Sequence, residues 1–200
     1  MNERKPLNHV GSIPLETKRL ILRKTSISDA KQMFYNWASD PEVTKHLMWE
    51  THSDIEITKN VLADWDKKNE NLDYYHWGIV LKENNQIIGT CGSFGIDEKN
   101  YKTEIGYCMS RSCWGKGYMT EAVSAMIDFL LNTVGANRII ARFDPINIGS
   151  GRVMEKSGMK FEGILRQDSY CEKRGYYDLV LYSILKDEYE KDAPYKRNAM

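Results

Sequence analysis

The chain has little cysteine, and its four cysteines are not spaced in pairs. No two of them form a CxxC motif, and the four histidines are equally scattered, without an HExxH or similar ligand spacing. The sequence therefore favours free thiols of a reducing cytoplasm over a disulfide framework or a zinc site, and we expect no metal.

The chain also lacks a surplus of charge and a long apolar run. Its 28 Lys and Arg residues balance 28 Asp and Glu residues, which argues against a nucleic-acid binder that relies on a global basic field. No apolar run is long enough to cross a bilayer, and the polar N-terminus, Met1 to Pro14, has no apolar signal core. We expect a cytoplasmic protein with neither a nucleic-acid nor a membrane partner.

The length of 200 residues suits one domain. Composition predicts a flexible N-terminal arm over residues 1–14, a globular domain over residues 15–187 and a charged tail over residues 188–200. Neither an internal repeat nor a low-complexity segment is present.

Apolar periodicity predicts four helices. Ser28-Asp29 is a predicted cap of a helix that runs to about Ala38, where Asp40-Pro41 interrupts it. Ser53-x-x-Glu56 resembles a capping box for the second helix. The third runs from Glu121 to Leu131, and the fourth is short.

Alternating or β-rich segments predict seven strands, which are residues 19–23, 75–81, 86–94, 103–109, 138–143, 161–166 and 176–185. Two helices come early, followed by a run of strands, and the later helices alternate with strands. This order predicts a mixed α+β fold with one parallel strand pair around the third helix.

The most informative stretch runs from Arg111 to Ala122. It lies between a predicted strand and a predicted helix, so it directs free backbone N–H groups and the positive end of a helix dipole at one place, as a phosphate site requires. Gly115 and Gly117 allow a sharp turn, and Lys116 adds a cation.

Taken alone, this stretch has two readings. The first is the phosphate site, and the second is a tight turn before a helix that the two glycines form with no ligand, beside a lysine that is solvated as most single lysines are. A nucleotide-binding P-loop is disfavoured, because no Gly-Lys-Ser/Thr follows a four-residue spacer.

Four segments together resemble the GNAT superfamily of acetyl-CoA-dependent N-acetyltransferases, and more narrowly its RimJ/RimL-like group. They are Leu15-Glu16-Thr17-Lys18-Arg19-Leu20-Ile21-Leu22-Arg23, Glu104-Ile105-Gly106-Tyr107, Trp114-Gly115-Lys116-Gly117-Tyr118-Met119-Thr120-Glu121-Ala122 and the segment from Asn147 to Met159. The resemblance implies a central twisted mixed sheet of about seven strands, splayed at the central strands and flanked by about four helices.

The resemblance also implies which residues hold acetyl-CoA. Backbone groups at the end of the central strand would hold the pantetheine arm, the following loop would hold the pyrophosphate, and Asn147 would bond to the cofactor or to the split in the sheet. The implied residues are Cys108, Met109, Ser110, Arg111, Trp114, Gly115, Lys116, Gly117, Tyr118, Met119, Thr120 and Asn147. Helical spacing adds Arg152, which shares a face with Lys156, as a candidate for a CoA phosphate, with a solvated basic face as the alternative.

Met119 departs from the superfamily pattern, which has Gly or Ala there. Its side chain would either narrow the cofactor groove or point into the core. Two locations are also open for Trp49 and Tyr75. Each of them either lines an acceptor pocket or belongs to the core.

Acetyl transfer to an amine requires removal of a proton from the amine and stabilisation of the leaving thiolate. The resemblance places Ser150 beside the CoA sulfur as the acid, and a cap of the following helix is the alternative role of this residue. Glu104, on the central strand, is the first candidate for the base, and a carboxylate that only faces solvent is the alternative. The resemblance implies a second candidate near the start of the final hairpin, where Asp168 lies, and water is the third.

The sequence thus predicts direct transfer of acetyl from acetyl-CoA to a primary amine, with a protein N-terminus as one acceptor. A small amine such as a polyamine, an amino acid or an antibiotic is the alternative. A CoA-binding sensor or interaction module without catalysis is an alternative of another class, and we expect a monomer or a homodimer.

Overall fold

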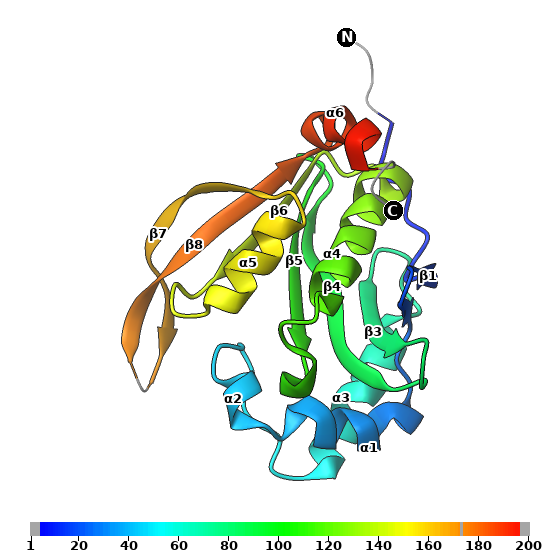
Figure 1. Ribbon diagram of the computed structural model, residues 1–200, viewed down its shortest axis with the longest axis vertical. Coiled ribbons are helices and arrows are strands. Elements are labelled where there is room, and N and C mark those ends of the chain that lie inside the picture. Colours follow the sequence, from blue (N-terminus) through cyan, green and yellow to red (C-terminus); the bar gives the residue numbers. More distant parts are fainter. Residues whose placement is uncertain (1–4, 173, 197–200) are drawn as a thin grey trace. The chain divides into compact units, whose positions relative to one another are not determined.

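The computed structural model describes residues 5–172 and 174–196. Figure 1 shows the order of the elements along the chain. The chain divides into two compact units, called here the N-terminal unit (residues 9–94 and 106–126) and the C-terminal unit (residues 1–8, 95–105 and 127–200). The boundaries predicted at residues 14 and 187 are not tested by this division and stay a prediction.

The described residues form eight strands in the order β1-β2-β3-β4-β5-β6-β8-β7. The strands are β1 Leu15–Glu16, β2 Leu20–Arg23, β3 Tyr75–Leu81, β4 Ile87–Asp97, β5 Lys102–Met109, β6 Arg138–Phe143, β7 Lys160–Cys171 and β8 Gly175–Leu185. Every predicted strand is present, and the sequence missed only the two-residue β1, which is too short to show alternation.

The same residues form six α-helices, which are α1 Ala30–Met33, α2 Pro41–Thr44, α3 Ile55–Lys68, α4 Tyr118–Asp128, α5 Ile148–Lys156 and α6 Lys186–Lys196. Short 3₁₀ or π segments flank them at η1 Ile27–Asp29, η2 Phe34–Ala38, η3 Arg111–Cys113 and η4 Phe129–Val134. The mixed fold class is therefore confirmed. The sequence missed α2, a single turn, and α6, whose polar residues show no apolar face.

The start of the predicted second helix is displaced by one residue. The second helix is capped by Asp54 rather than Ser53, because the Asp54 carboxylate accepts a hydrogen bond from the Glu56 N–H at 2.9 Å. The pair Asp40-Pro41, which was predicted to interrupt the first helix, also begins the next helix. Asp40 caps α2, and Pro41 occupies its first turn, where the missing N–H costs nothing.

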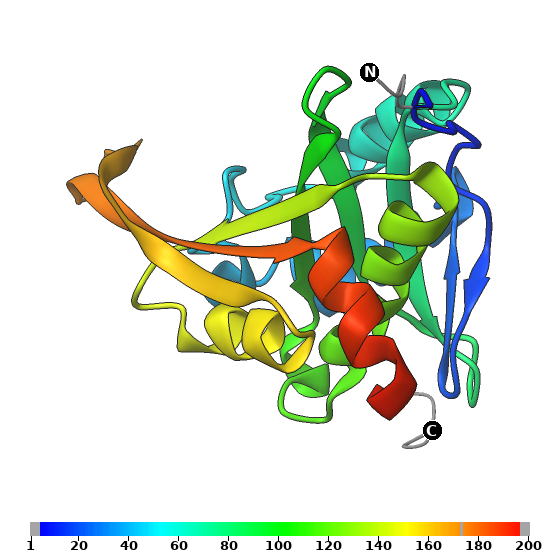
Figure 2. The ribbon, with the colours of Figure 1, turned by 90° about the horizontal axis from the view of Figure 1, so that it is seen from above.

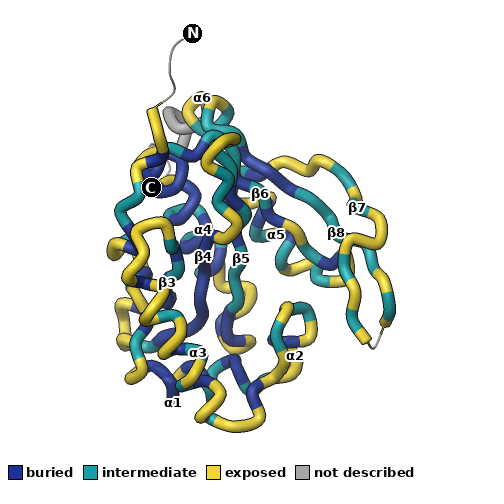
Figure 3. The backbone as a smooth tube through the Cα atoms, turned by 180° about the vertical axis from the view of Figure 1, so that it is seen from behind, coloured by how far each residue is buried: buried dark blue, intermediate teal, exposed yellow. Residues whose placement is uncertain are grey.

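In the N-terminal unit, β1, β2, β3 and β4 pair antiparallel in sequence order. β3 is almost entirely buried (Figure 3), so it reads as an apolar run rather than an alternating one. One core cluster joins this sheet to α1, η2 and α3 through Ala30, Met33, Trp37, Ala38, Val43, Leu62, Val80 and Ile87.

The segment before β1 is hydrogen-bonded to the start of β3. The Ser12 hydroxyl donates to the Tyr74 carbonyl and accepts from the His76 N–H, and the Trp77 indole donates to the Ile13 carbonyl at 2.7 Å. Ser12 is buried. These bonds join Ser12 and Ile13 to β3 within the N-terminal unit.

In the C-terminal unit, β5 pairs with β6 in the parallel direction, as predicted. The register joins Lys102, Thr103 and Glu104 to residues 138–140, and β5 continues to Met109. β6 and β7 both pair antiparallel with β8. Figure 2 shows β7 and β8 as a long twisted pair.

Helix α5 packs within the same unit at a glycine. A Cβ on Gly151 would lie 2.6 Å from the Phe143 ring, so only glycine allows this approach. The Tyr182 hydroxyl on β8 donates to Glu155 of the same helix at 2.8 Å. The helix that carries Ser150 is thereby fixed against β6 and β8.

Candidate active site

The loop before α4 has the backbone geometry of an anion site. Gly115 and Gly117 have φ values of 74° and 79°, in the left-handed region that favours glycine. Within the described chain, the N–H groups of residues 115–117 have no hydrogen-bond partner. The first three N–H groups of α4, at residues 118–120, have no intrahelical partner by geometry. Six consecutive amides are therefore available to an anion.

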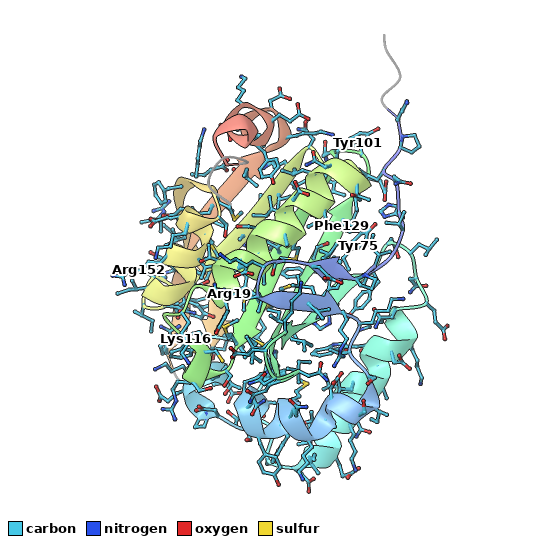
Figure 4. The ribbon with its side chains drawn as sticks, turned by 45° about the vertical axis from the view of Figure 1, so that its right-hand side comes forward. Arg19, Tyr75, Tyr101, Lys116, Phe129 and Arg152 are labelled. Carbon is cyan, nitrogen blue, oxygen red and sulfur yellow. The ribbon has the colours of Figure 1, made fainter. Side chains whose placement is uncertain are left out.

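Arg19 contacts this loop and, together with Thr17, also contacts Glu121 of α4. These contacts are called here the Arg19 brace. Arg19 donates from Nη1 to the Lys116 carbonyl at 3.0 Å, and its guanidinium lies 4.4 Å from the Tyr118 ring centroid. Its Nε donates to Glu121 Oε2 at 2.7 Å, and Thr17 donates to Oε1 of the same carboxylate at 2.6 Å. Figure 4 labels Arg19 and Lys116.

Burial alone would raise the pKa of Glu121. The hydrogen bonds from Thr17 and Arg19 outweigh that effect, so its pKa lies below the ordinary value and the carboxylate is ionised. Sequence reasoning found Arg19 and Glu121 only as parts of two motifs. Nothing in the spacing of residues 102 positions apart indicates that they touch.

Several cofactor residues implied by the resemblance already use part of their hydrogen-bonding capacity. The Trp114 N–H donates to the Arg111 carbonyl and its indole donates to the Met109 carbonyl at 2.9 Å, while the Ser110 N–H donates to the Ile88 carbonyl. Cys108 is paired with Thr90 through its sulfur at 3.4 Å, and burial raises the pKa of its thiol.

Met119 points into the protein rather than into a groove, since only 7% of it is exposed. The structure thus decides between the two readings of this residue. Arg111 is tied by an ion pair to Asp40, the cap of α2, with 3.2 Å between Nε and Oδ2.

Asn147 and Ser150 occupy the start of α5 in the C-terminal unit. Asn147 is the cap, because its side chain accepts a hydrogen bond from the Ser150 N–H at 3.3 Å. Ser150 is therefore not the cap that its alternative reading suggested. It is the third residue of the helix, and its side chain is partly exposed.

Glu104 is not a solitary carboxylate. Arg142 on β6 donates to both of its oxygens, from Nε and Nη2, each at 2.9 Å. The same guanidinium donates from Nη1 to Asp168 on β7 at 2.6 Å. The structure therefore joins the two base candidates through an arginine that sequence reasoning did not select.

The remaining candidates differ in exposure. Lys116 and Arg152 are exposed and form no ion pair with the described residues, so both remain open to a phosphate. Tyr75 is fully buried and bonded to His9 through its hydroxyl at 2.9 Å, so it belongs to the core rather than to an acceptor pocket. Trp49 packs partly buried against the core cluster.

No group of three or more His, Cys, Asp or Glu side chains in the described residues is arranged to hold a metal ion. None of the described helices is both long and apolar enough to cross a membrane.

Comparison with known proteins decides the family. The profile of the family described as acetyltransferase (GNAT) domain matches residues 19–160, which is more than half of the chain. The chain belongs to the GNAT acetyltransferase family. The match includes in full three of the four segments that carry the resemblance, and it includes the first segment from Arg19 onward.

Individual relatives agree with this assignment. The chain is 35% identical over 175 residues to the uncharacterized N-acetyltransferase p20 of Bacillus licheniformis, covering 88% of this chain and 97% of the relative. A GNAT-family acetyltransferase structure from Bacillus anthracis is similar with a TM-score of 0.75 and 27% identity, over 88% of this chain and 99% of that one.

The fold is also shared with a ribosomal-protein-S5-alanine acetyltransferase from Vibrio fischeri, with a TM-score of 0.72 and 23% identity over 88% of this chain and 98% of that one. The resemblance to the RimJ/RimL-like group is thus confirmed at the level of the fold. This chain is a GNAT N-acetyltransferase, and the family implies acetyl-CoA as its co-substrate.

Proposed function

We propose that this acetyltransferase binds acetyl-CoA through the loop between η3 and α4 and transfers the acetyl group directly to a protein N-terminus. The run of six available amides at residues 115–120 is the observation that carries the donor part of the proposal. Backbone N–H groups and a helix N-terminus suit a pyrophosphate, and the exposed Lys116 adds a cation.

The residues present fit this donor. A Cβ at Gly115 would have nothing within 4 Å, one at Gly117 would meet Nη2 of Arg19 at 3.4 Å, and Met119 is buried. In the proposal, Cys108, Met109, Ser110 and Arg111 carry the backbone that lies along the pantetheine arm, and Trp114 borders the loop. The exposed Arg152 meets a phosphate of the cofactor.

When bound, acetyl-CoA supplies an acetyl group already activated as a thioester. Ser150 holds the proton that the thiolate leaving group requires, and Asn147 keeps Ser150 in place through the capping bond. Transfer is direct, without an acyl-enzyme. Cys113 is buried and therefore unsuited to act as a nucleophile.

Glu104 accepts the proton of the acceptor amine in this proposal. Since both of its oxygens accept hydrogen bonds from Arg142, we expect it to receive that proton through a water molecule rather than by direct contact. An N-terminal α-amine has a pKa near 8 and so needs less help than a lysine amine.

The choice of a protein N-terminus over a small amine is supported by the name of the similar Vibrio fischeri enzyme, which acts on a ribosomal-protein alanine. The test is an acceptor screen of the purified protein with acetyl-CoA, following release of free thiol. N-terminal peptides, polyamines, amino acids and aminoglycosides would be compared at equal concentration. Faster release with any small amine than with every peptide would refute the acceptor assignment.

A further inference from the structure

The ion-pair trio Glu104, Arg142 and Asp168 carries one excess negative charge. Two carboxylates share one guanidinium, through Nε–Oε1 and Nη2–Oε2 distances of 2.9 Å and an Nη1–Oδ2 distance of 2.6 Å. The Asp168 side chain is 34% exposed, against 16% for Glu104, so the excess charge faces solvent mainly at Asp168.

Neighbouring ion pairs in the C-terminal unit do not cancel this charge. Arg138 forms an ion pair with Glu162, and Arg174 forms one with Asp144. Each of these two pairs is neutral by itself. Of these three groups, the trio is the negative centre, because it has two carboxylates on one guanidinium.

A distortion of β7 brings Asp168 to Arg142. β8 lies between β6 and β7 in the strand order, so a regular β7 would keep the two residues a strand apart. The register shifts between Leu165 and Ser169, and Gln167 has a φ of 53°, a sparsely populated conformation for a residue with a side chain. Strained residues of this kind persist where they position something.

Apolar side chains lie on the same face of the sheet as the trio. Arg142 stands opposite Leu181 in the register, Leu179 follows at the alternate position of the same strand, and Leu165 stands opposite Leu179. All three leucines are only partly buried. This face therefore combines an apolar strip with a negative centre.

We infer that the trio selects acceptors by charge, favouring an amine on an apolar body with no negative group nearby. The inference rests on the proposed function, in which Glu104 takes the acceptor proton. An N-terminus followed by a neutral or basic residue meets attraction at Asp168, whereas one followed by an acidic residue meets repulsion. Free amino acids are disfavoured for the same reason, because each carries its own carboxylate.

The expected size of the effect follows from Coulomb's law. A unit charge about 6 Å away, at an effective dielectric between half that of water and that of water, changes the rate of productive binding about three- to tenfold. Added salt reduces this factor, because the trio is partly exposed.

The test uses two acceptor series with the full-length protein and acetyl-CoA. The first is Ala-Xaa-Phe-amide with Asn, Asp or Lys in the second position, and the second is hexylamine, 6-aminohexanoate and 1,6-diaminohexane. We expect kcat/KM for the Asn peptide to exceed that for the Asp peptide by about three- to tenfold, with hexylamine exceeding 6-aminohexanoate likewise.

Two variants move this ratio in opposite directions. Asp168→Asn removes the excess charge and brings the ratio close to one, whereas Arg142→Gln leaves two unpaired carboxylates and raises the ratio above that of the wild type. Because the readout is a ratio, a general loss of activity in either variant does not obscure it. Glu188→Gln, which makes the same change in charge at the Lys160 pair, leaves the ratio unchanged.

Equal rates for the Asn and Asp peptides in the wild type would overturn the inference. So would a ratio that moves in the same direction in both variants, since this would indicate a structural role only. If Arg142→Gln does not fold, the Asp168→Asn ratio decides alone. Absence of thiol release with every acceptor in both series is a different result, because it removes the proposed function and the inference with it.

Discussion

Arg19 and Glu121, 102 residues apart in the chain, form an ion pair in which Nε and Oε2 are 2.7 Å apart. The Arg19 N–H also donates to Oε1 at 2.8 Å, so the start of β2 and the first turn of α4 are joined twice. The same arginine reaches the Lys116 carbonyl. The position of the glycine loop therefore depends on a residue from the opening strand segment.

This relationship predicts that Glu121→Gln weakens cofactor binding. The change keeps the shape of the side chain but removes the charge that holds Arg19, so we expect the affinity for CoA to fall about tenfold, or about 1.4 kcal/mol. Calorimetric titration with CoA measures this directly. The matched control is Glu16→Gln, which breaks the exposed ion pair with Lys82 and should leave the affinity unchanged.

The left-handed backbone conformation of Gly117 leads to a second prediction, on stability and on the KM for acetyl-CoA. Its φ of 79° is costly for any residue with a side chain, and a Cβ there would lie 3.4 Å from Nη2 of Arg19. We expect Gly117→Ala to lose about 1–2 kcal/mol of stability and to raise the KM for acetyl-CoA several-fold. Gly135→Ala, at a φ of 92° with nothing within 4 Å, should cost similar stability and leave that KM unchanged. Equal KM values in the two variants would argue against the loop as the cofactor site.

Ser150 and Asn147 can be separated by stability and rate. Because Asn147 is the cap, Asn147→Ala should cost about 1 kcal/mol in thermal or urea unfolding. Ser150→Ala should leave the melting temperature close to that of the wild type and reduce kcat about a hundredfold or more, if Ser150 supplies the proton. A kcat in Ser150→Ala within threefold of the wild type would exclude Ser150 as the acid.

The lowered pKa of Glu162 leads us to predict that this residue contributes to the loss of stability in acid. Hydrogen bonds from Arg138, and then from Ser183, lower its pKa to about 2 from an ordinary value of 4.5. Because the folded pKa is depressed, its stabilisation is present above about pH 4.5 and is lost as the pH falls from 4.5 towards 2.

The Glu162 side chain is 33% exposed, so solvent screening limits this contribution to about 1 kcal/mol. Urea unfolding of the wild type and of Glu162→Gln at pH 7 and at pH 3 measures it. The difference between the two proteins should be smaller at pH 3 than at pH 7, because part of the stabilisation is lost at the lower pH. A difference that is equal at both values would show that ionisation of Glu162 is not responsible.

Much of the fold was predictable because its signals are local. A β-rich apolar run predicted β3 and a β-rich segment predicted β6, both with their observed bounds, and the apolar face of α4 and the following η4 was visible at helical spacing. The elements that were missed, β1 and α2, are too short for periodicity to appear. α6 was taken for a charged tail because its polar residues show no apolar face.

The candidate site was predictable only in part. The glycine loop and the Asn147–Ser150 segment can be recognised from the spacing of their residues, because each is one continuous piece of chain. Arg142 carries no such signal. It reads as one polar residue of a strand, and its importance comes from two carboxylates on other strands, one of them brought within reach by the distortion at Gln167.

The sequence by itself determined the family resemblance, the donor that this family implies and the expectation of a sharp turn at Gly115 and Gly117, because these depend on neighbours along the chain. The tertiary structure alone decided that Met119 is buried, that Asn147 rather than Ser150 caps α5, and that Arg19 braces the loop. It also placed Glu104 and Asp168 on a single guanidinium. The physical reason is that hydrogen bonds and ion pairs act over a few ångströms of space, whatever the distance along the chain.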